Sequence, residues 1–267
     1  MRFSTLALGT IAFLAANPAM AQEETAPPKP ITITGSVTAI TDYRFRGATQ
    51  TNGDPAIQGT LNVNHSSGFY VGTFLSSIDG GADGSTPALT NYGDVEVDLY
   101  GGFTKTLPSG LGFDVGLLYY WYADGAKSVN TDFFEPYASV NYTVGPANLK
   151  VGGNYAWGGQ KGLNFTPGND DSLYLYGEAS VAIPKTPITL KGHFGRTKGS
   201  LGLLNPTIAD DSYLDWSLTA EAVGGPLKVG VSYVDTDITN GVVPGIGHYA
   251  HELGRGSTVL GYVAFSF

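Results

Sequence analysis

The chain has 267 residues, no cysteine and a formal net charge of −9. The lack of cysteine excludes a disulfide framework, and so acidic a chain is a poor partner for nucleic acid, which we exclude. Glycine (38 residues), tyrosine (16) and phenylalanine (13) are abundant, and only 14% of the residues are charged. This composition fits an exported protein built from strands.

The N-terminal segment has the features of a secretory signal peptide. A positive charge at Arg2 precedes a short apolar run and a small-x-small motif that ends at Ala21, which predicts export and cleavage after Ala21. The apolar run is shorter than the roughly 20 residues of a membrane-spanning helix, and no later segment comes closer. We therefore expect a signal peptide at 1–21 and a periplasmic, proline-rich spacer at 22–30. The mature chain then meets a membrane only as a β-barrel.

From Ile31 onward, apolar and polar residues alternate with the period of a β-strand. One face of the first predicted strand carries Ile31, Ile33, Gly35, Val37, Ala39, Thr41, Tyr43 and Phe45, and the other carries Thr32, Thr34, Ser36, Thr38, Ile40, Asp42, Arg44 and Arg46. An alternation of about 15 residues exceeds the 4–8 residues of a usual half-buried strand. This length is typical of a strand that crosses a membrane.

The same alternation recurs along the rest of the chain. The predicted strands lie at 31–46, 57–64, 69–76, 94–103, 111–122, 131–142, 149–157, 173–183, 188–197, 213–223, 227–234 and 258–267. Their number, about 12, is even, as in single-chain bacterial barrels. Among ionisable residues, only Arg196 is expected on an apolar face, at a strand end. We predict an all-β fold, namely a transmembrane antiparallel up-and-down barrel of residues 31–267.

The connections between the predicted strands alternate in length. Short turns are expected at 65–68, 106–110, 143–146, 184–187 and 224–226, and longer loops at 47–54, 77–91, 123–130, 158–170, 198–211 and 235–256. Barrels of the outer membrane have short periplasmic turns and long extracellular loops. Both termini are therefore expected on the periplasmic side.

Aromatic residues fall near the ends of the predicted strands, where membrane interfaces would lie. The loop-end set is Tyr43, Phe45, Tyr119, Trp121, Tyr155, Trp157, Phe194, Trp216 and Tyr233, and the turn-end set is Phe69, Phe103, Tyr142, Phe265 and Phe267. Two such girdles indicate outer-membrane lipid and lipopolysaccharide as surroundings. Phe265 and the terminal Phe267 also resemble the final strand that barrel-assembly machinery recognises, which makes that machinery an expected partner.

Three segments carry a resemblance to a known family. The run TDYRFRGATQTNGDPAIQGTLNVNHSSGFYVGT (Thr41–Thr73) is followed by VEVDLYGGF (Val95–Phe103) and FDVGLLYYWY (Phe113–Tyr122). Together they resemble the TorF family of porins, a conserved proteobacterial family also called Gcw_chp. The matching segments cover the first third of the mature chain. The resemblance implies a porin-type barrel in the outer membrane of a Gram-negative bacterium, and it supplies no catalytic residues.

Charged residues and tyrosines fall on the polar faces, which would line the lumen. The residues expected to line the pore are Asp42, Arg44, Arg46, Asp94, Glu96, Asp98, Asp114, Lys150, Tyr174, Tyr176, Glu178, Lys191 and Asp215. We also expect Tyr70, Tyr100 and Tyr120 to help occlude the channel. Acids outnumber bases on these faces, so the lumen should be net negative.

Two groups of lumen residues allow more than one interpretation. Asp94, Glu96 and Asp98 share one strand face and are either a cation-attracting stripe, as charged rings are in channels, or a solvated wall. The charges at 42–46 supply either a transverse field across the pore or, slightly favoured, an ion-pair network that rigidifies the interior.

Nothing in the sequence indicates catalysis. Of the four histidines, only His193 is expected inside the barrel, and none lies in a supporting motif. His248 and His251 form an H-x-x-H pair in a glycine-rich loop, where helical ligand spacing is absent. We therefore expect no enzyme activity, no cofactor and no metal.

These patterns favour a pore for passive diffusion of small hydrophilic solutes, with a weak preference for cations. Barrels of about 8 strands are filled by side chains and those of 16–18 leave an aqueous channel, so a narrow channel is expected here. Two alternatives stay open. One is a non-conducting structural or adhesive barrel whose extracellular loops bind a partner. The other is a soluble exported barrel that carries a ligand on an inward apolar face.

Overall fold

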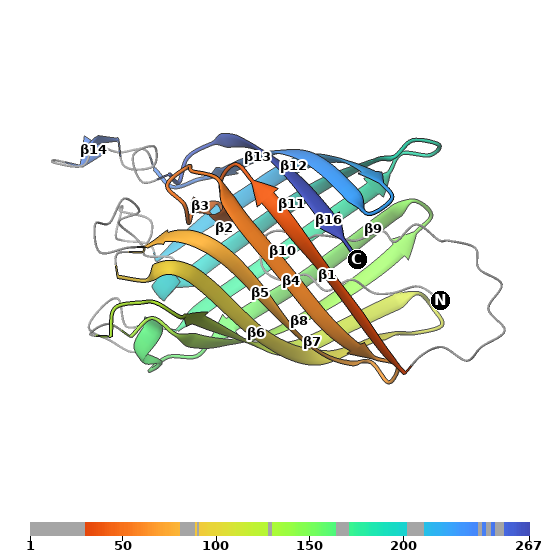
Figure 1. Cartoon of the computed structure of the whole chain (residues 1–267), viewed down its shortest axis with the longest axis horizontal. Coiled ribbons are helices and arrows are strands. Elements are labelled where there is room, and N and C mark those ends of the chain that lie inside the picture. The colour runs from red at the N-terminus through yellow and green to blue at the C-terminus, as the bar shows by residue number, and fades with distance from the viewer. Residues whose placement is uncertain are drawn as a thin grey trace.

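Twelve strands pair edge to edge into one closed antiparallel barrel in the computed structural model (Figure 1). They are β1 (Ile31–Ile40), β4 (Ala56–His65), β5 (Phe69–Gly80), β6 (Gly93–Thr106), β7 (Leu111–Tyr122), β8 (Phe133–Val144), β9 (Ala147–Ala156), β10 (Ser172–Ala182), β11 (Ile188–Gly199), β12 (Ser212–Gly224), β13 (Leu227–Thr236) and β16 (Thr258–Ser266). The shorter elements are β2 (Arg44–Phe45), β3 (Ala48–Thr49), η2 (Lys161–Leu163), β14 (Val242–Val243) and β15 (Gly247–His248).

The structure describes residues 30–80, 89, 91–127, 130–163, 171–201, 211–239, 242–243, 247–248 and 254–267. The expected signal peptide at 1–21 and all of the spacer except Pro30 lie outside these residues. Among the described residues, no helix has the length and apolar character needed to cross a membrane.

The barrel closes between its first and last strands. Each barrel strand pairs with its neighbour in sequence, and β1 pairs with both β4 and β16. Gly35 and Phe267 exchange two backbone hydrogen bonds of 3.0 Å across this seam. Ile31 pairs with His65 beside the turn between β4 and β5, so both described ends lie toward the short turns. The predicted all-β, up-and-down barrel of 12 strands is confirmed.

Apolar side chains cover the outside of the barrel. Val151 is 63% exposed and Leu218 and Val259 are similarly open, while Lys150, Ser217 and Thr219 beside them point inward. Burying apolar surface is favourable and leaving it in water is not, so a continuous outer band of this kind indicates a lipid-facing wall. This arrangement is the reverse of the soluble ligand-carrying barrel, and that alternative was wrong.

Ionised side chains on the outer face are confined to strand ends. Lys105 is exposed at the turn end of β6, and Arg196 and Lys198 are exposed at the loop end of β11, which extends two residues further than expected. Asp235 takes an equivalent place on β13. The prediction that Arg196 alone carries charge on this face was therefore wrong, because the strands reach beyond the apolar band into the zone of lipid headgroups.

Inside the barrel, tyrosine rings occupy the space over glycines of adjacent strands. The pairs are Tyr70 over Gly102, Tyr100 over Gly72, Tyr137 over Gly116, Tyr174 over Gly195, Tyr176 over Gly152 and Tyr262 over Gly230. In each pair, a Cβ atom on the glycine would collide with the ring. The tyrosines therefore lie along the wall, and the expectation that Tyr70, Tyr100, Tyr120, Tyr174 and Tyr176 help to occlude the channel stays a prediction.

The first strand ends earlier than its alternation predicts. After Ile40 the chain turns inward, and β2 and β3 form a small hairpin with left-handed backbone at Arg46 (φ 47°) and Gly47 (φ 82°). Tyr43 is only 3% exposed and Arg46 is fully buried. We call residues 42–51 the inward segment.

Three predictions about this region were wrong. Residues 41–46 do not continue the strand, Tyr43 and Phe45 do not join the lipid-facing girdle, and residues 47–51 do not form an outer loop. The physical reason is that three charged side chains at positions 42, 44 and 46 find partners inside the barrel. The glycine at position 47 allows the chain to reverse there.

Introducing charge on the outer face tests the assignment of strand faces. Val151 lies in the middle of β9 and points outward, so Val151→Arg should destabilise the barrel by about 2–4 kcal/mol. The preceding residue, Lys150, points into the lumen. Lys150→Arg is the matched control, because it keeps a positive charge on the inner face. Urea unfolding of protein refolded into lipid vesicles measures both. Equal losses from the two variants would contradict the assignment.

The barrel seam depends on a missing side chain at Gly35. A Cβ atom there would lie 2.6 Å from the Phe267 ring and 2.7 Å from the carbonyl oxygen of Thr60. Gly35→Ala should therefore cost about 1–3 kcal/mol of unfolding free energy through overpacking. Gly59→Ala, one strand away, meets no atom closer than 3.9 Å and serves as control. If both alanine variants lose the same unfolding free energy, the packing of the Phe267 ring does not depend on the missing side chain at Gly35.

Candidate functional site: the barrel lumen

The lumen has two halves that differ in burial. Toward the long connections, which we call the loop half, the inward-facing Glu96, Asp98 and Glu135 are buried. Toward the short turns, which we call the turn half, Lys150 and Glu178 are partly exposed. The inward segment lies in the loop half, whereas the turn half holds these partly exposed charges beside the buried Glu221 and Lys228.

Arg46 anchors the inward segment to the barrel wall. Its Nη2 atom donates to both oxygens of Glu135 on β8, at 2.7 and 2.9 Å. Tyr120 (3.1 Å) and Asn154 (3.0 Å) donate to the same carboxylate. The guanidinium also lies 4.2 Å from the ring centre of Tyr174. A buried ion pair is tolerable only with such additional hydrogen bonds, and here several strands supply them.

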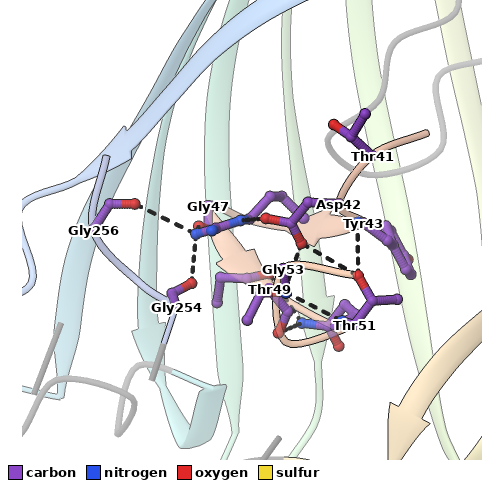
Figure 2. Close-up of polar contacts among 12 residues, drawn as sticks. Thr41, Asp42, Tyr43, Gly47, Thr49, Thr51, Gly53, Gly254 and Gly256 are labelled. Carbon is purple, nitrogen blue, oxygen red and sulfur yellow. Dashed lines mark hydrogen bonds and ion pairs between the residues drawn. The ribbon is translucent and has the colours of Figure 1, made fainter. Parts of the chain in front are cut away.

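Arg44 and Asp42 form a second anchor, drawn in Figure 2. Arg44 donates to the Asp42 carboxylate at 2.5 Å and to the carbonyl oxygen of Gly254 at 2.5 Å. Thr49 donates through its hydroxyl to Asp42 (2.6 Å) and through its backbone N–H to Gly254 (2.9 Å). These contacts tie the inward segment to the chain just before β16. Of the two interpretations of the charges at 42–46, the geometry matches the ion-pair network.

A ladder of charged groups crosses β9 to β12. Lys150 lies 4.0 Å from Glu178, and the two ring nitrogens of His193 lie 3.5 Å from Glu178 and 3.0 Å from Asp215. The Tyr174 hydroxyl is 2.7 Å from His193 Nε2 and donates to Asp215 at 3.1 Å. This ladder joins the loop half to the turn half.

A second charged group lies close to the short turns. Glu221 on β12 lies 2.9 Å from Lys191 and 3.6 Å from Lys228, and it accepts a hydrogen bond of 2.6 Å from Tyr262. The lysines of the described lumen are thus each within 4.0 Å of a carboxylate oxygen. Their charges are compensated locally.

The expected acidic stripe divides into separate positions. Glu96 and Asp98 point into the loop half and are buried, whereas Asp94 is exposed at the loop end of β6. Asp114 on β7 lies in the turn half, where it accepts a hydrogen bond of 2.6 Å from Tyr70. Only Glu96 and Asp98 therefore form a close pair.

Sequence reasoning missed the carbonyl groups of Gly254 and Gly256, which accept hydrogen bonds from Arg44. Nothing in the local sequence marks a backbone acceptor for a side chain more than 200 residues away. A signal for the inward turn did exist, since Gly47 follows three closely spaced charges, Asp42, Arg44 and Arg46, at a strand end. Charge density there and a turn-forming glycine both favour a departure from the lipid-facing wall.

The described residues contain no group of three or more histidine, cysteine or acidic side chains placed to hold a metal ion. His193 lies inside the barrel between two carboxylates. Of the H-x-x-H pair, His248 lies in β15 and His251 lies outside the described residues.

A closed barrel with an apolar outer wall and a charged interior belongs to the class of porin-like transmembrane barrels. A solved NanC porin aligns over 87% of this chain and 98% of its own, with a TM-score of 0.57 at 12% identity. A porin refined at high resolution (11% identity, 89% and 100% covered, TM-score 0.42) and Salmonella typhi OmpF in complex with daunomycin (9%, 89% and 97%, 0.45) are more distant. At such identities the likeness concerns the fold alone.

The chain belongs to the family described as bacterial protein of unknown function (Gcw_chp), whose model matches residues 24–256. The resemblance to Gcw_chp is thereby confirmed, whereas the association with the name TorF stays a prediction. No curated protein shows significant sequence similarity to the chain.

Removing one partner of the Arg46–Glu135 pair should strongly destabilise the barrel. Arg46→Met or Glu135→Gln leaves an uncompensated buried group, so each should cost about 3–5 kcal/mol. The double variant should lose less than the sum, because the second change removes the charge that the first left unpaired. Urea unfolding in lipid vesicles measures all three. The exposed Arg196→Met should change the unfolding free energy by less than about 0.5 kcal/mol, and strict additivity would argue against the pair.

Proposed function

We propose that this protein is an outer-membrane pore through which small hydrophilic solutes diffuse passively. The observation that carries the proposal is a closed barrel with an apolar outer wall, whose interior bears charged side chains and leaves Lys150, Glu178 and Lys191 partly exposed. The interior also holds buried apolar side chains, Ile40, Leu118 and Leu260 among them, next to the charged ones. A charged, wet interior within an apolar wall is typical of a channel.

The inward segment supports a narrow passage rather than a wide one. Its buried side chains, Tyr43 and Arg46 above all, take up space in the loop half. Twelve strands also enclose less space than the 16–18 of wide porins. Solutes that cross must pass beside this segment, so small ones are favoured.

A weak preference for cations is the second part of the proposal. The basic groups Lys150, Lys191 and Lys228 each face a carboxylate, which removes most of their field. Glu96 and Asp98 have no salt bridge in the described part of the chain, and a low-dielectric wall focuses the field of such groups. The preference must weaken as salt rises, since screening acts over about 8 Å at physiological ionic strength.

The proposal includes an orientation and partners. Export would follow cleavage after Ala21, with the short turns and both termini in the periplasm and the long connections outside. Barrel-assembly machinery would recognise Phe265 and Phe267, which end the closing strand. Arg196 and Lys198, exposed at the loop end of β11, suit the phosphate groups of lipopolysaccharide.

A non-conducting barrel, structural or adhesive, is the second candidate. The observation that favours it is the same inward segment, because Arg46 is fully buried and held from several strands. In that case the long connections would bind a partner, and the lumen would stay closed.

Conductance across a planar bilayer under a KCl gradient, in EDTA, tests the proposal. We expect a small conductance and a reversal potential that favours K⁺ at low salt. Replacing Asp94→Asn, Glu96→Gln and Asp98→Asn together should move the reversal potential toward zero without unfolding the barrel. Preferential passage of anions, or an unchanged potential in the triple variant, would reject the cation preference.

The Arg46→Met variant separates the two candidate functions. If the wild type passes no current and this variant does, the inward segment closes the barrel. If neither passes current, the structural or adhesive function is the better one.

A further inference from the structure

Two buried acids in the loop half have no salt bridge to any residue in the described part of the chain. Glu96 is 2% exposed and Asp98 is 4% exposed, and both point into the lumen from β6. The other buried acids of this half have partners: Asp42 is paired with Arg44, Glu135 with Arg46, and Asp215 contacts His193. Within the described residues, Glu96 Oε2 and Asp98 Oδ1 have no hydrogen-bond partner. Burying a carboxylate without a partner costs several kcal/mol, on the order of the stability of a small domain.

A third oxygen without a donor lies in the same cross-strand row. Gln58 on β4 is opposite Ser76 on β5, and Ser76 is opposite Glu96. Gln58 is 3% exposed, its Nε2 donates to Ser76 Oγ at 3.2 Å, and its Oε1 has no donor among the described residues. Inward-facing side chains of neighbouring strands converge in a narrow barrel. Glu96 Oε2 and Gln58 Oε1 therefore lie in one row without a hydrogen-bond partner among the described residues.

The inward segment covers this group of oxygens. Tyr43 is buried near Glu96 and packs against Phe74 of β5, with ring centres 5.8 Å apart. Asp98 is opposite Tyr120 on β7. Bulk water is thereby kept from two negative charges, so a cation at this place would experience a strong field.

We infer that Glu96, Asp98 and Gln58 bind a divalent cation of the Ca²⁺ type between the inward segment and the barrel wall. Two carboxylates balance its charge, and hard cations take carboxylate and amide oxygens as ligands. The ligands offered include neither nitrogen nor sulfur, which disfavours zinc and copper. The inference does not depend on conduction. A bound cation would, however, neutralise the acids that give the proposed cation preference, so adding Ca²⁺ should reduce that preference.

Ca²⁺ binding by the full mature chain, refolded in detergent without lipopolysaccharide, tests the inference. Equilibrium dialysis should find one tightly bound Ca²⁺ per chain, and Ca²⁺ should raise the unfolding temperature saturably compared with EDTA. Glu96→Gln combined with Asp98→Asn should weaken binding at least tenfold and abolish the shift. The exposed Asp54→Asn, which also removes a carboxylate near the loop end, should keep both.

Gln58→Leu provides a second variant that retains both acids. It should fold and bind Ca²⁺ more weakly than the wild type, by several-fold. If the wild type binds no Ca²⁺, the acids are held by a shared proton and the inference fails. It also fails if the Glu96/Asp98 double variant binds as tightly as the wild type, because the cation then lies elsewhere.

Discussion

Every backbone N–H and C=O group that faces lipid must find its partner within the protein, because the bilayer interior holds no water. At the seam between β1 and β16, where the sheet closes, Gly35 and Phe267 meet this requirement by exchanging backbone hydrogen bonds. Once the sheet is closed, one face of each strand is committed to lipid and the other to the interior. The division between apolar and charged side chains follows from that closure.

Closure leaves the opposite problem, a polar interior that must be either hydrated or filled. The protein uses both solutions. In the loop half, Arg46 and Glu135 satisfy each other and hold a folded segment in place. In the turn half, Lys150, Glu178 and Lys191 remain in contact with water. The same side chains thus determine the stability of the barrel and the properties of any path through it.

Alternation along the chain was enough to predict the strands, their number and the inward direction of most charges. It was not enough to locate the end of β1, because Asp42, Arg44 and Arg46 alternate equally well on a strand and on an inward turn. An aromatic residue such as Tyr43 is equally suited to a lipid interface and to a packed interior. The sequence also did not show how deep each side chain lies in the barrel, because only the pairing register places Asp94 at the rim and Glu96 and Asp98 inside.

The tyrosine–glycine pairs have a consequence for the width of the barrel. Alternation alone forbids a slip of one residue between neighbouring strands, because it would turn charges toward lipid. A slip of two residues leaves every side chain on its own face of the sheet, so the alternation does not forbid it. It would, however, move each ring from its glycine onto a residue with a side chain. The stagger of the strands and their number together set the diameter of a barrel. By fixing the stagger, the tyrosine–glycine contacts therefore help to fix the diameter of this barrel.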